Sequence, residues 1–213
     1  MIMSTLKPAG LAATLAVLTA CGGTSVPLVP VTPTPQLPAA GDRLSLKEVQ
    51  SIAADIQPGY DAAGITPKRD VPTRGGASYT GYVAGTLEVP GRATDVAGLM
   101  EMGVDFGRNE VGGRVGNFVT SAGKPLDGLL TLRDGRLNRT LNSSQVTIQS
   151  DVNGTLTSEA GERIAVDAAI ARGGFKGRDG AYAGVPIDGT ILIDNGRTIE
   201  RGVIDIEGAL VRN

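Results

Sequence analysis

Apolar and polar residues alternate along most of the chain after residue 77, and short polar breaks interrupt the alternation. Val104 and Phe106 stand before one such break, and Val111 stands after it. A period of two residues indicates a strand with one buried face, and a Gly/Asn break between two such runs indicates a hairpin. Residues 104–116 therefore predict a β-hairpin, and the same pattern recurs along the rest of this region.

Eight segments share this pattern, which predicts eight antiparallel strands joined by short loops. We place them at 78–89, 96–106, 110–119, from about 126, 145–157, 162–172, 181–194 and 198–212. Asp134-Gly135 either interrupts the fourth strand or forms a turn after it. Gly173-Gly174 suggests a bulge or bend near the end of the sixth strand. Asn195-Gly196 is the strongest hairpin signal and predicts a type I′ turn.

The predicted fold is all-β: an eight-stranded antiparallel up-and-down β-barrel over residues 77–213. Closing such a sheet removes both exposed edges. At eight strands the interior is filled by side chains or holds one small ligand. Glycines on the inward phase suit close packing in a narrow barrel; they are Gly81, Gly85, Gly113, Gly128, Gly189 and Gly208. Aromatic residues make up 3% of the chain, too few for the two girdles of a transmembrane barrel.

One helix is predicted before the barrel, over residues 44–57. Ser45 and Glu48 have the spacing of a capping box, and Pro58-Gly59 is expected to end the helix. Four apolar residues form one stripe along it: Val49, Ile52, Ala53 and Ile56. We expect this stripe to pack on the wall or one end of the barrel, or else to bind a partner. The rest of residues 44–76 is expected to be a connecting loop.

The N-terminal region has the pattern of an export signal. Residues 1–20 contain Lys7 and a short apolar run that is too short to span a bilayer and is typical of a signal peptide. Leu18-Thr19-Ala20-Cys21 resembles the bacterial lipobox, in which the cysteine is acylated and becomes the new N-terminus. Gly22, in place of Asp, favours release to the outer membrane by the same resemblance. We therefore expect acylated Cys21 to hold the protein in the lipid bilayer.

Residues 21–43 are expected to form a tether. Prolines recur every two or three residues among Val, Thr and Ala, at Pro27, Pro30, Pro33, Pro35 and Pro38. Such a segment favours extended polyproline II, so about fifteen residues span roughly 45 Å. We expect the tether to enter at the barrel end where the first strand begins. Basic residues of the nearby turns would then face anionic head groups: Arg108, Arg133, Arg136, Arg139, Arg172, Lys176 and Arg178.

Composition excludes several classes of function. The chain has 213 residues, a formal net charge of −2, no histidine and one cysteine. Ser-His-Asp and Cys-His catalysis and Cys/His metal sites therefore cannot be built. The charge lacks the basic excess of a nucleic-acid binder. Gly112-Gly113-Arg114-Val115-Gly116 lies in a strand pattern and opens no helix, which argues against a phosphate-binding loop. We expect no enzyme activity, cofactor or metal, and a monomer.

Four tyrosines were considered as ligands of haem or ferric ion: Tyr60, Tyr79, Tyr82 and Tyr182. Packing in the core or at the barrel rim is the alternative role for each of them. Of the two roles, packing is the one that we expect.

Three glycine-aromatic motifs suggest a family. Tyr79-Thr80-Gly81-Tyr82, Val104-Asp105-Phe106-Gly107 with Val111-Gly112-Gly113, and Gly174-Phe175-Lys176-Gly177 resemble the barrel domain of transferrin-binding protein B. The related surface lipoproteins, factor H-binding protein among them, share that barrel and a lipidated cysteine. The resemblance covers residues 77–213. The chain departs from the family because it lacks a second lobe and an aromatic residue in its last strand.

The resemblance implies an outer-membrane lipoprotein, with the barrel exposed to the exterior or to the periplasm, that binds a host protein or an iron or haem carrier through its barrel loops. No ligand residue of the family maps onto this sequence. Two alternatives remain: a lipocalin-like carrier that uses the barrel interior, and a structural or accessory lipoprotein of the envelope. A filled interior would argue against the carrier.

Overall fold

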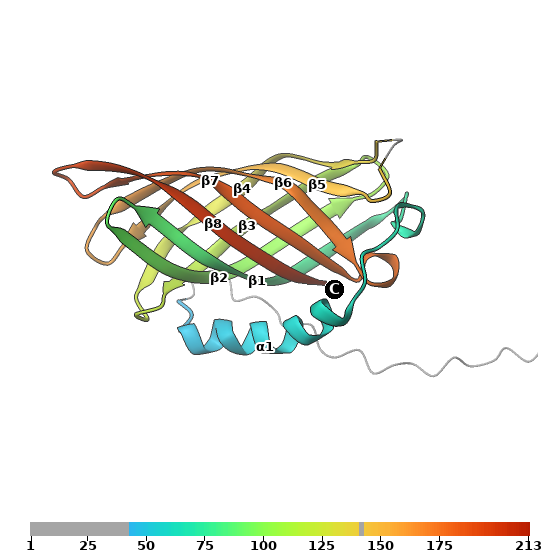
Figure 1. Ribbon diagram of the computed structural model, residues 1–213, viewed down its shortest axis with the longest axis horizontal. Helices are drawn as coiled ribbons and strands as arrows, with labels where there is room; N and C mark the ends of the chain where they lie inside the picture. The colour runs from blue at the N-terminus through green and yellow to red at the C-terminus, as the bar shows by residue number, and fades with distance from the viewer. Residues whose placement is uncertain (1–42, 141–142) are drawn as a thin grey trace, which may run out of the picture. The chain divides into compact units, whose positions relative to one another are not determined.

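The computed structural model describes residues 43–140 and 143–213, and its main element is a closed barrel of eight antiparallel strands (Figure 1). The strands are β1 (Gly76–Val89), β2 (Arg92–Asp105), β3 (Glu110–Thr120), β4 (Pro125–Asn138), β5 (Thr147–Ser158), β6 (Arg163–Lys176), β7 (Tyr182–Asp194) and β8 (Ile199–Arg212). Each strand pairs with the next, and β8 pairs with β1. The predicted all-β barrel is confirmed.

The interior is filled by one continuous apolar cluster to which all eight strands contribute. The inward phase is the one that the alternation predicts: Ile191 on β7 and Ile206 on β8, for example, are 0% and 1% exposed, whereas Thr190 faces outward and is exposed. The inward glycines sit where an added Cβ would lie within 3 Å of an atom of a neighbouring strand. The backbones of neighbouring strands thus approach closely at these glycines.

Two strands contain an interruption that the sequence signalled. Asp134 has a left-handed backbone (φ 51°), and the pairing with β3 and β5 shifts around it, but β4 continues to Asn138. Asp134-Gly135 is therefore an irregularity within the strand and not a turn. The pairing of β6 also shifts on both sides near Gly173 and Gly174, as expected of a bulge.

The turn between β7 and β8 differs from the prediction. A type I′ turn needs positive φ at both central residues. Gly196 has φ 81°, but Asn195 does not have a positive φ. The side-chain oxygen of Asn195 instead accepts the backbone N–H groups of Arg197 and Thr198, both at 2.9 Å. The asparagine thus organises this turn through its side chain, and the type I′ assignment was wrong.

Helix α1 (Leu46–Ala62) begins as predicted but ends later. The capping box is formed, with the Ser45 backbone N–H donating to Glu48 Oε2 at 2.7 Å. The helix runs through Pro58 and Gly59, which were expected to stop it. Contacts after the proline hold the last turn in place.

Two glycines allow those contacts. A Cβ on Gly59 would lie 2.3 Å from the Tyr182 hydroxyl, and a Cβ on Gly184 would lie 2.2 Å from the Tyr60 hydroxyl. The Tyr60 and Tyr182 rings meet edge to face, with centroids 6.3 Å apart. This interlock joins the end of α1 to β7, and it explains why the helix extends beyond its predicted end.

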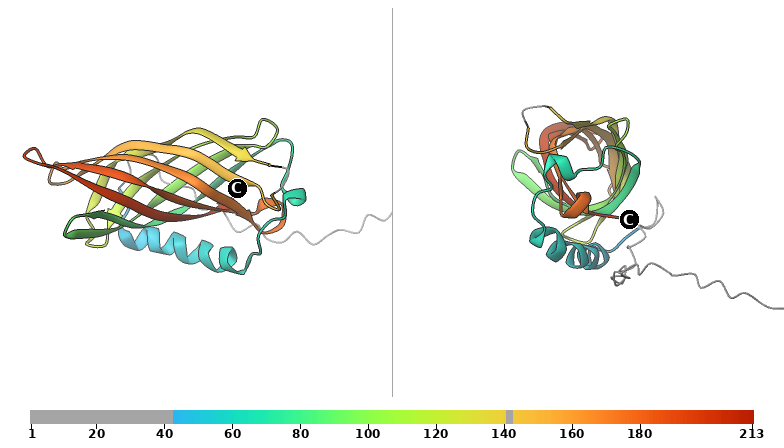
Figure 2. Two further views of the ribbon diagram at one scale, coloured as in Figure 1. Left: turned by 45° about the horizontal axis from the view of Figure 1, so that its top comes forward. Right: turned by 90° about the vertical axis from the view of Figure 1, so that its right-hand side faces the viewer.

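The helix lies along the outer wall of the barrel, over β8, β1 and β2 (Figure 2). Its buried residues are Val49 and Ile56. Val49 packs against Leu99 and Val119, which face outward from β2 and β3. The wall-packing interpretation of the apolar stripe is therefore confirmed.

The two ends of the barrel differ. At the closed end, where β1 begins, residues 63–75 and the short helices η1 (Lys68–Asp70) and η2 (Arg178–Gly180) lie across the opening (Figure 2, right). The opposite end, the mouth, carries the turns β1–β2, β3–β4, β5–β6 and β7–β8. We use these two names below.

The described chain begins at the mouth and not at the closed end. Arg43 Nη2 bonds Asp127 Oδ2 at 2.9 Å, and Asp127 lies at the start of β4, beside the mouth. From there α1 runs back along the wall to the closed end, where β1 begins. The expectation that the tether enters where the first strand begins was therefore wrong, and the basic residues of the closed-end turns do not surround the chain's entry.

Two neighbouring residues of β7 test the register. Ile191→Asp places a charge in the filled interior and should lower the free energy of unfolding by at least about 3 kcal/mol. Thr190→Asp faces water and should change it by no more than about 0.5 kcal/mol. Urea denaturation of both variants measures the difference. Equal losses would contradict the inward and outward assignment.

Candidate functional site

The closed end is sealed from inside by aromatic side chains. Tyr79 and Phe106 each pack on Phe175, with ring centroids 5.9 and 6.0 Å apart. Val71, from the segment that crosses the opening, is buried in the same cluster. The three glycine-aromatic motifs of the sequence thus meet at one place, where they have a packing role.

Hydrogen bonds hold the crossing segment to β6. The Thr66 backbone N–H donates to the Phe175 carbonyl at 2.9 Å, and the Gly177 N–H donates to the Gly64 carbonyl at 2.7 Å. Thr66 is buried, and its hydroxyl donates to the Gly177 carbonyl at 2.7 Å. These bonds form an isolated antiparallel β-bridge between Ile65 and Lys176, which holds the crossing segment over the end of the barrel.

The four tyrosines all make protein contacts. Tyr79 is fully buried and donates its hydroxyl proton to the Gly180 carbonyl at 2.8 Å. Burial raises the pKa of Tyr79 to about 12. Tyr82 bonds Gln57 of α1, and the Tyr60 ring stacks under the Lys176 ammonium, 4.0 Å from the ring centroid. Tyr182 takes part in the interlock described above, so all four tyrosines have the packing role that we expected.

The mouth contains a small apolar cleft. Its volume is about 170 Å³, and its walls include Leu87, Val89, Leu126, Ile164 and Ile193. Sites for small molecules usually have volumes of about 300–1,000 Å³. The cleft is therefore smaller than a usual small-molecule site, and its apolar walls belong to the barrel core.

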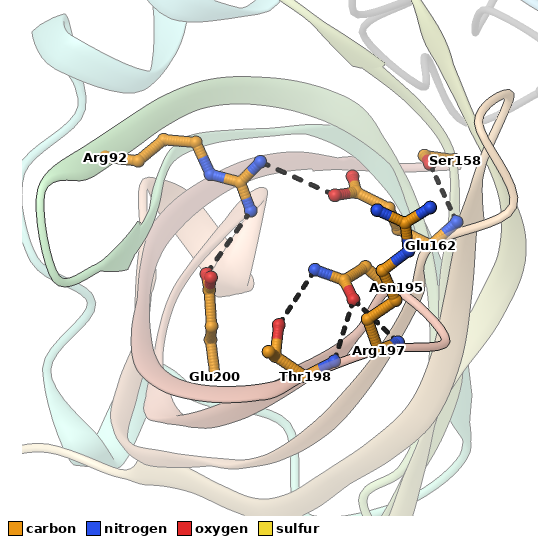
Figure 3. Close-up of polar contacts among 7 residues, drawn as sticks. All are labelled: Arg92, Ser158, Glu162, Asn195, Arg197, Thr198 and Glu200. Carbon is orange, nitrogen blue, oxygen red and sulfur yellow. Dashed lines mark hydrogen bonds and ion pairs between the residues drawn. The ribbon is translucent and has the colours of Figure 1, made fainter.

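Charged residues form the rim of this mouth (Figure 3). The Arg92 guanidinium, at the β1–β2 turn, lies 3.6 Å from a Glu162 carboxylate oxygen and 3.8 Å from one of Glu200. It thereby links three turns across the opening. All three side chains are partly exposed, so each pair contributes little to stability, at most about 1 kcal/mol.

The outer wall carries a wider hollow over β1, β2 and β3 near the closed end. Two adjoining depressions of about 650 and 560 Å³ share Ser78, Gly103 and Asn213. Ser78 lies opposite Gly103, and Gly103 lies opposite Gly112, so small residues form one row across three strands. We call this row and its two flanks the trough.

Ion pairs form both flanks of the trough. On one side Arg114 contacts Glu101 at 2.7 Å, which raises the pKa of Arg114. On the other side Arg108 lies 3.0 Å from both Asp105 and Glu110. Hydrogen bonds from the Arg108 backbone, above all, lower the pKa of Asp105. The flanks are four residues apart along β2, which is roughly 13 Å at the rise of a strand.

The fold itself does not require glycine in the floor of the trough. A Cβ on Gly112 would meet no atom within 4 Å, and one on Gly103 would meet only the Gly112 carbonyl oxygen, at 4.0 Å. Neither residue has a positive φ. A glycine inside a strand is less stable than alanine by roughly 0.5–1 kcal/mol and often marks close approach by another molecule. The sequence alone could have indicated this surface, because the alternation of apolar and polar residues places both glycines on the outer face of the barrel.

The predicted lipidation site, Cys21, lies outside the described residues, as do the signal peptide and residues 21–42 of the tether. Within residues 43–140 and 143–213, no helix is long and apolar enough to cross a bilayer. The same residues contain no group of three or more His, Cys, Asp or Glu side chains that could hold a metal ion.

Comparison with protein-family models and with curated proteins finds no match to this chain. The resemblance to the transferrin-binding protein B barrel therefore remains a prediction from its three short motifs. The trough and the mouth stand as the two candidate sites on their geometry alone.

The buried hydroxyl of Tyr79 makes stability depend on alkaline pH. The folded pKa of about 12 lies above the ordinary value of 10, so this group stabilises the fold below pH 10 and loses that contribution as the pH rises from 10 to 12. Tyr79→Phe should lower the free energy of unfolding by about 1 kcal/mol at pH 8. Urea denaturation should show the gap between the two proteins closing above pH 10. A constant gap would contradict this assignment.

Proposed function

We propose that this protein is a non-enzymatic binding module, held in the outer membrane by an acylated Cys21, that binds a macromolecular partner on the outside of its barrel. The observation that carries the proposal is the trough. Its floor contains glycines at positions where the fold has room for a side chain. Its flanks contain ion-paired arginine and carboxylate side chains.

The shape of the trough favours a partner that is an extended peptide segment or the edge of another protein. It is open to solvent and crosses three strands, so it offers contact along its length and little enclosure. Backbone groups and small residues can approach a partner closely, and the charged flanks supply specificity and orientation. An extended peptide segment or the edge of another protein fits this geometry better than a small enclosed molecule does.

The trough also changes the expected place of binding. The resemblance to the transferrin-binding protein B barrel implied binding through loops, to a host protein or an iron or haem carrier. At the closed end the crossing segment occupies the opening, and at the mouth the cleft has a volume of only about 170 Å³. The wall of β1–β3 is the more open surface, and we place the binding site there.

The first alternative is a lipocalin-like carrier. It would need interior space, but the inward positions of all eight strands belong to one packed cluster, and the mouth cleft measures only about 170 Å³. These observations favour the binding module. The second alternative, an envelope structural or accessory lipoprotein, uses the same anchor and fold and differs only in having no partner at the trough.

The trough hypothesis is tested by filling its floor. Gly112→Phe should fold, because the position has open space, and it should weaken capture of the partner about tenfold or more, equivalent to about 1.4 kcal/mol. The measurement is recovery of specific proteins by the purified protein from extracts of the organism's natural surroundings. Thr190→Phe, on the outer face of β7, is the matched control and should bind like the unchanged protein.

Each other outcome favours a different function. Equal recovery by both variants would contradict binding at the trough. A small molecule retained in stoichiometric amount, seen by native mass spectrometry, would support the carrier. If the unchanged protein recovers no partner and retains no small molecule, the accessory role is favoured.

Anchoring is tested separately at Cys21. Cys21→Ser removes the sulfur that would carry the lipid, so the protein should move from the membrane to the soluble fraction, as cell fractionation would show. Gly22→Asp keeps the cysteine and should remain in a membrane fraction, which makes it the matched control. Unchanged membrane association of Cys21→Ser would refute the lipid anchor.

A further inference from the structure

Exposed apolar side chains gather on one part of the barrel. Among residues 43–140 and 143–213, three of the five large apolar residues that are exposed lie on the outer face of the β7–β8 hairpin. They are Leu192, Ile199 and Val203, which are 41%, 69% and 47% exposed. All three are in the part of the hairpin nearest the mouth.

This hairpin extends beyond its neighbours at the mouth (Figure 1). Residues 199–202 of β8 pair with β7 but have no partner on β1, whose pairing with β8 ends at Glu88 and Val203. Arg197 lies in the turn, and Arg201 lies between the apolar residues, opposite Leu192. The tip therefore combines exposed apolar side chains with arginines on a projecting element.

We propose that this tip rests in the head-group layer of the bilayer to which the protein is anchored. The proposal depends on the lipid anchor of the proposed function. Apolar side chains flanked by arginines suit the membrane interface, because the apolar parts enter the acyl boundary while the guanidinium groups stay among the phosphates. The occupant is a lipid surface and not a soluble partner.

The path of the chain supports this orientation. Arg43, the first described residue, is held beside the mouth by Asp127, and the predicted tether and Cys21 precede it. The chain then follows α1 for 17 residues, about 25 Å, to reach the closed end. The predicted tether therefore joins the described chain beside the mouth, and its reach of roughly 45 Å is long enough for the tip to contact the bilayer. Tethering also raises the effective concentration of the tip at the surface, so a weak contact is populated.

The charges around the mouth indicate what drives the contact. The rim contains several carboxylates, and Glu88 and Asp194 lie next to the apolar patch. Attraction to anionic lipid therefore cannot be the main force. The contact should form on zwitterionic vesicles as well as anionic ones, and added salt should change it little, because burial of apolar surface is not screened.

The absence of tryptophan from the chain allows a direct test. Ile199→Trp places a single fluorophore at the tip, and Leu129→Trp places one on the outer wall of β4, at an exposed apolar residue away from the mouth. Each lipidated protein is purified and reconstituted into phosphatidylcholine vesicles, with and without brominated acyl chains. A tip that enters about 5–10 Å should be quenched at least about twofold more than the control, with emission at shorter wavelength.

The outcomes separate the two hypotheses. Vesicle flotation is measured first: if no variant floats with the vesicles, the lipid anchor fails and this proposal fails with it. If both variants float but are quenched equally, the anchor stands and the tip proposal is overturned. Val203→Trp should behave like Ile199→Trp, which provides a second probe if the first disturbs the turn. Loss of the quenching difference in high salt would contradict an apolar contact.

Discussion

Closure of the sheet is the constraint on which the rest of this structure depends. Pairing of β8 with β1 leaves no strand edge along most of the barrel, and it fixes the interior width at that of eight strands. At that width inward side chains meet across the axis, so the interior becomes a packed core that includes Ile191 and Ile206. Binding surface must then come from the outer wall and the two ends.

At the closed end, where the strands stop, the apolar interior has to be covered by other side chains. Phe106 and Phe175 come from segments far apart in the sequence, and they fill the opening together with Tyr79. The segment before β1 pairs with the end of β6 over them. Helix α1 is fastened to the wall by the Tyr60–Tyr182 interlock at its end and by Val49 near its start, and the described chain begins beside the mouth.

Much of the fold could be predicted, because local patterns carry the information that decides it. Period-two alternation sets the face of Ile191, and the spacing of Ser45 and Glu48 sets the start of α1. The end of the helix could not be predicted, since Pro58 stops a helix in isolation whereas the contacts of Tyr60 lie on distant strands. For the same reason the direction of α1 along the barrel, and hence the entry of the chain at the mouth, was missed.

Other features were present in the sequence but needed a further step of interpretation. Leu99 is an apolar residue on an outward phase, and this departure from alternation marks the place where α1 lies. Gly103 and Gly112 face outward, where close packing inside the barrel does not account for a glycine, so their position is itself a signal of an open surface. The type I′ prediction at Asn195-Gly196 was wrong because this pair is compatible with more than one type of turn. The hydrogen bonds that the Asn195 side chain accepts decide which turn forms.

The two proposed surfaces are compatible because they lie at different heights on the barrel. Gly103 and Gly112 lie close to the β2–β3 turn, at the closed end, whereas Ile199 lies at the mouth. With the mouth toward the bilayer, the trough stands away from the lipid by roughly the 25 Å length of α1. A partner can then reach the trough without displacing the tip.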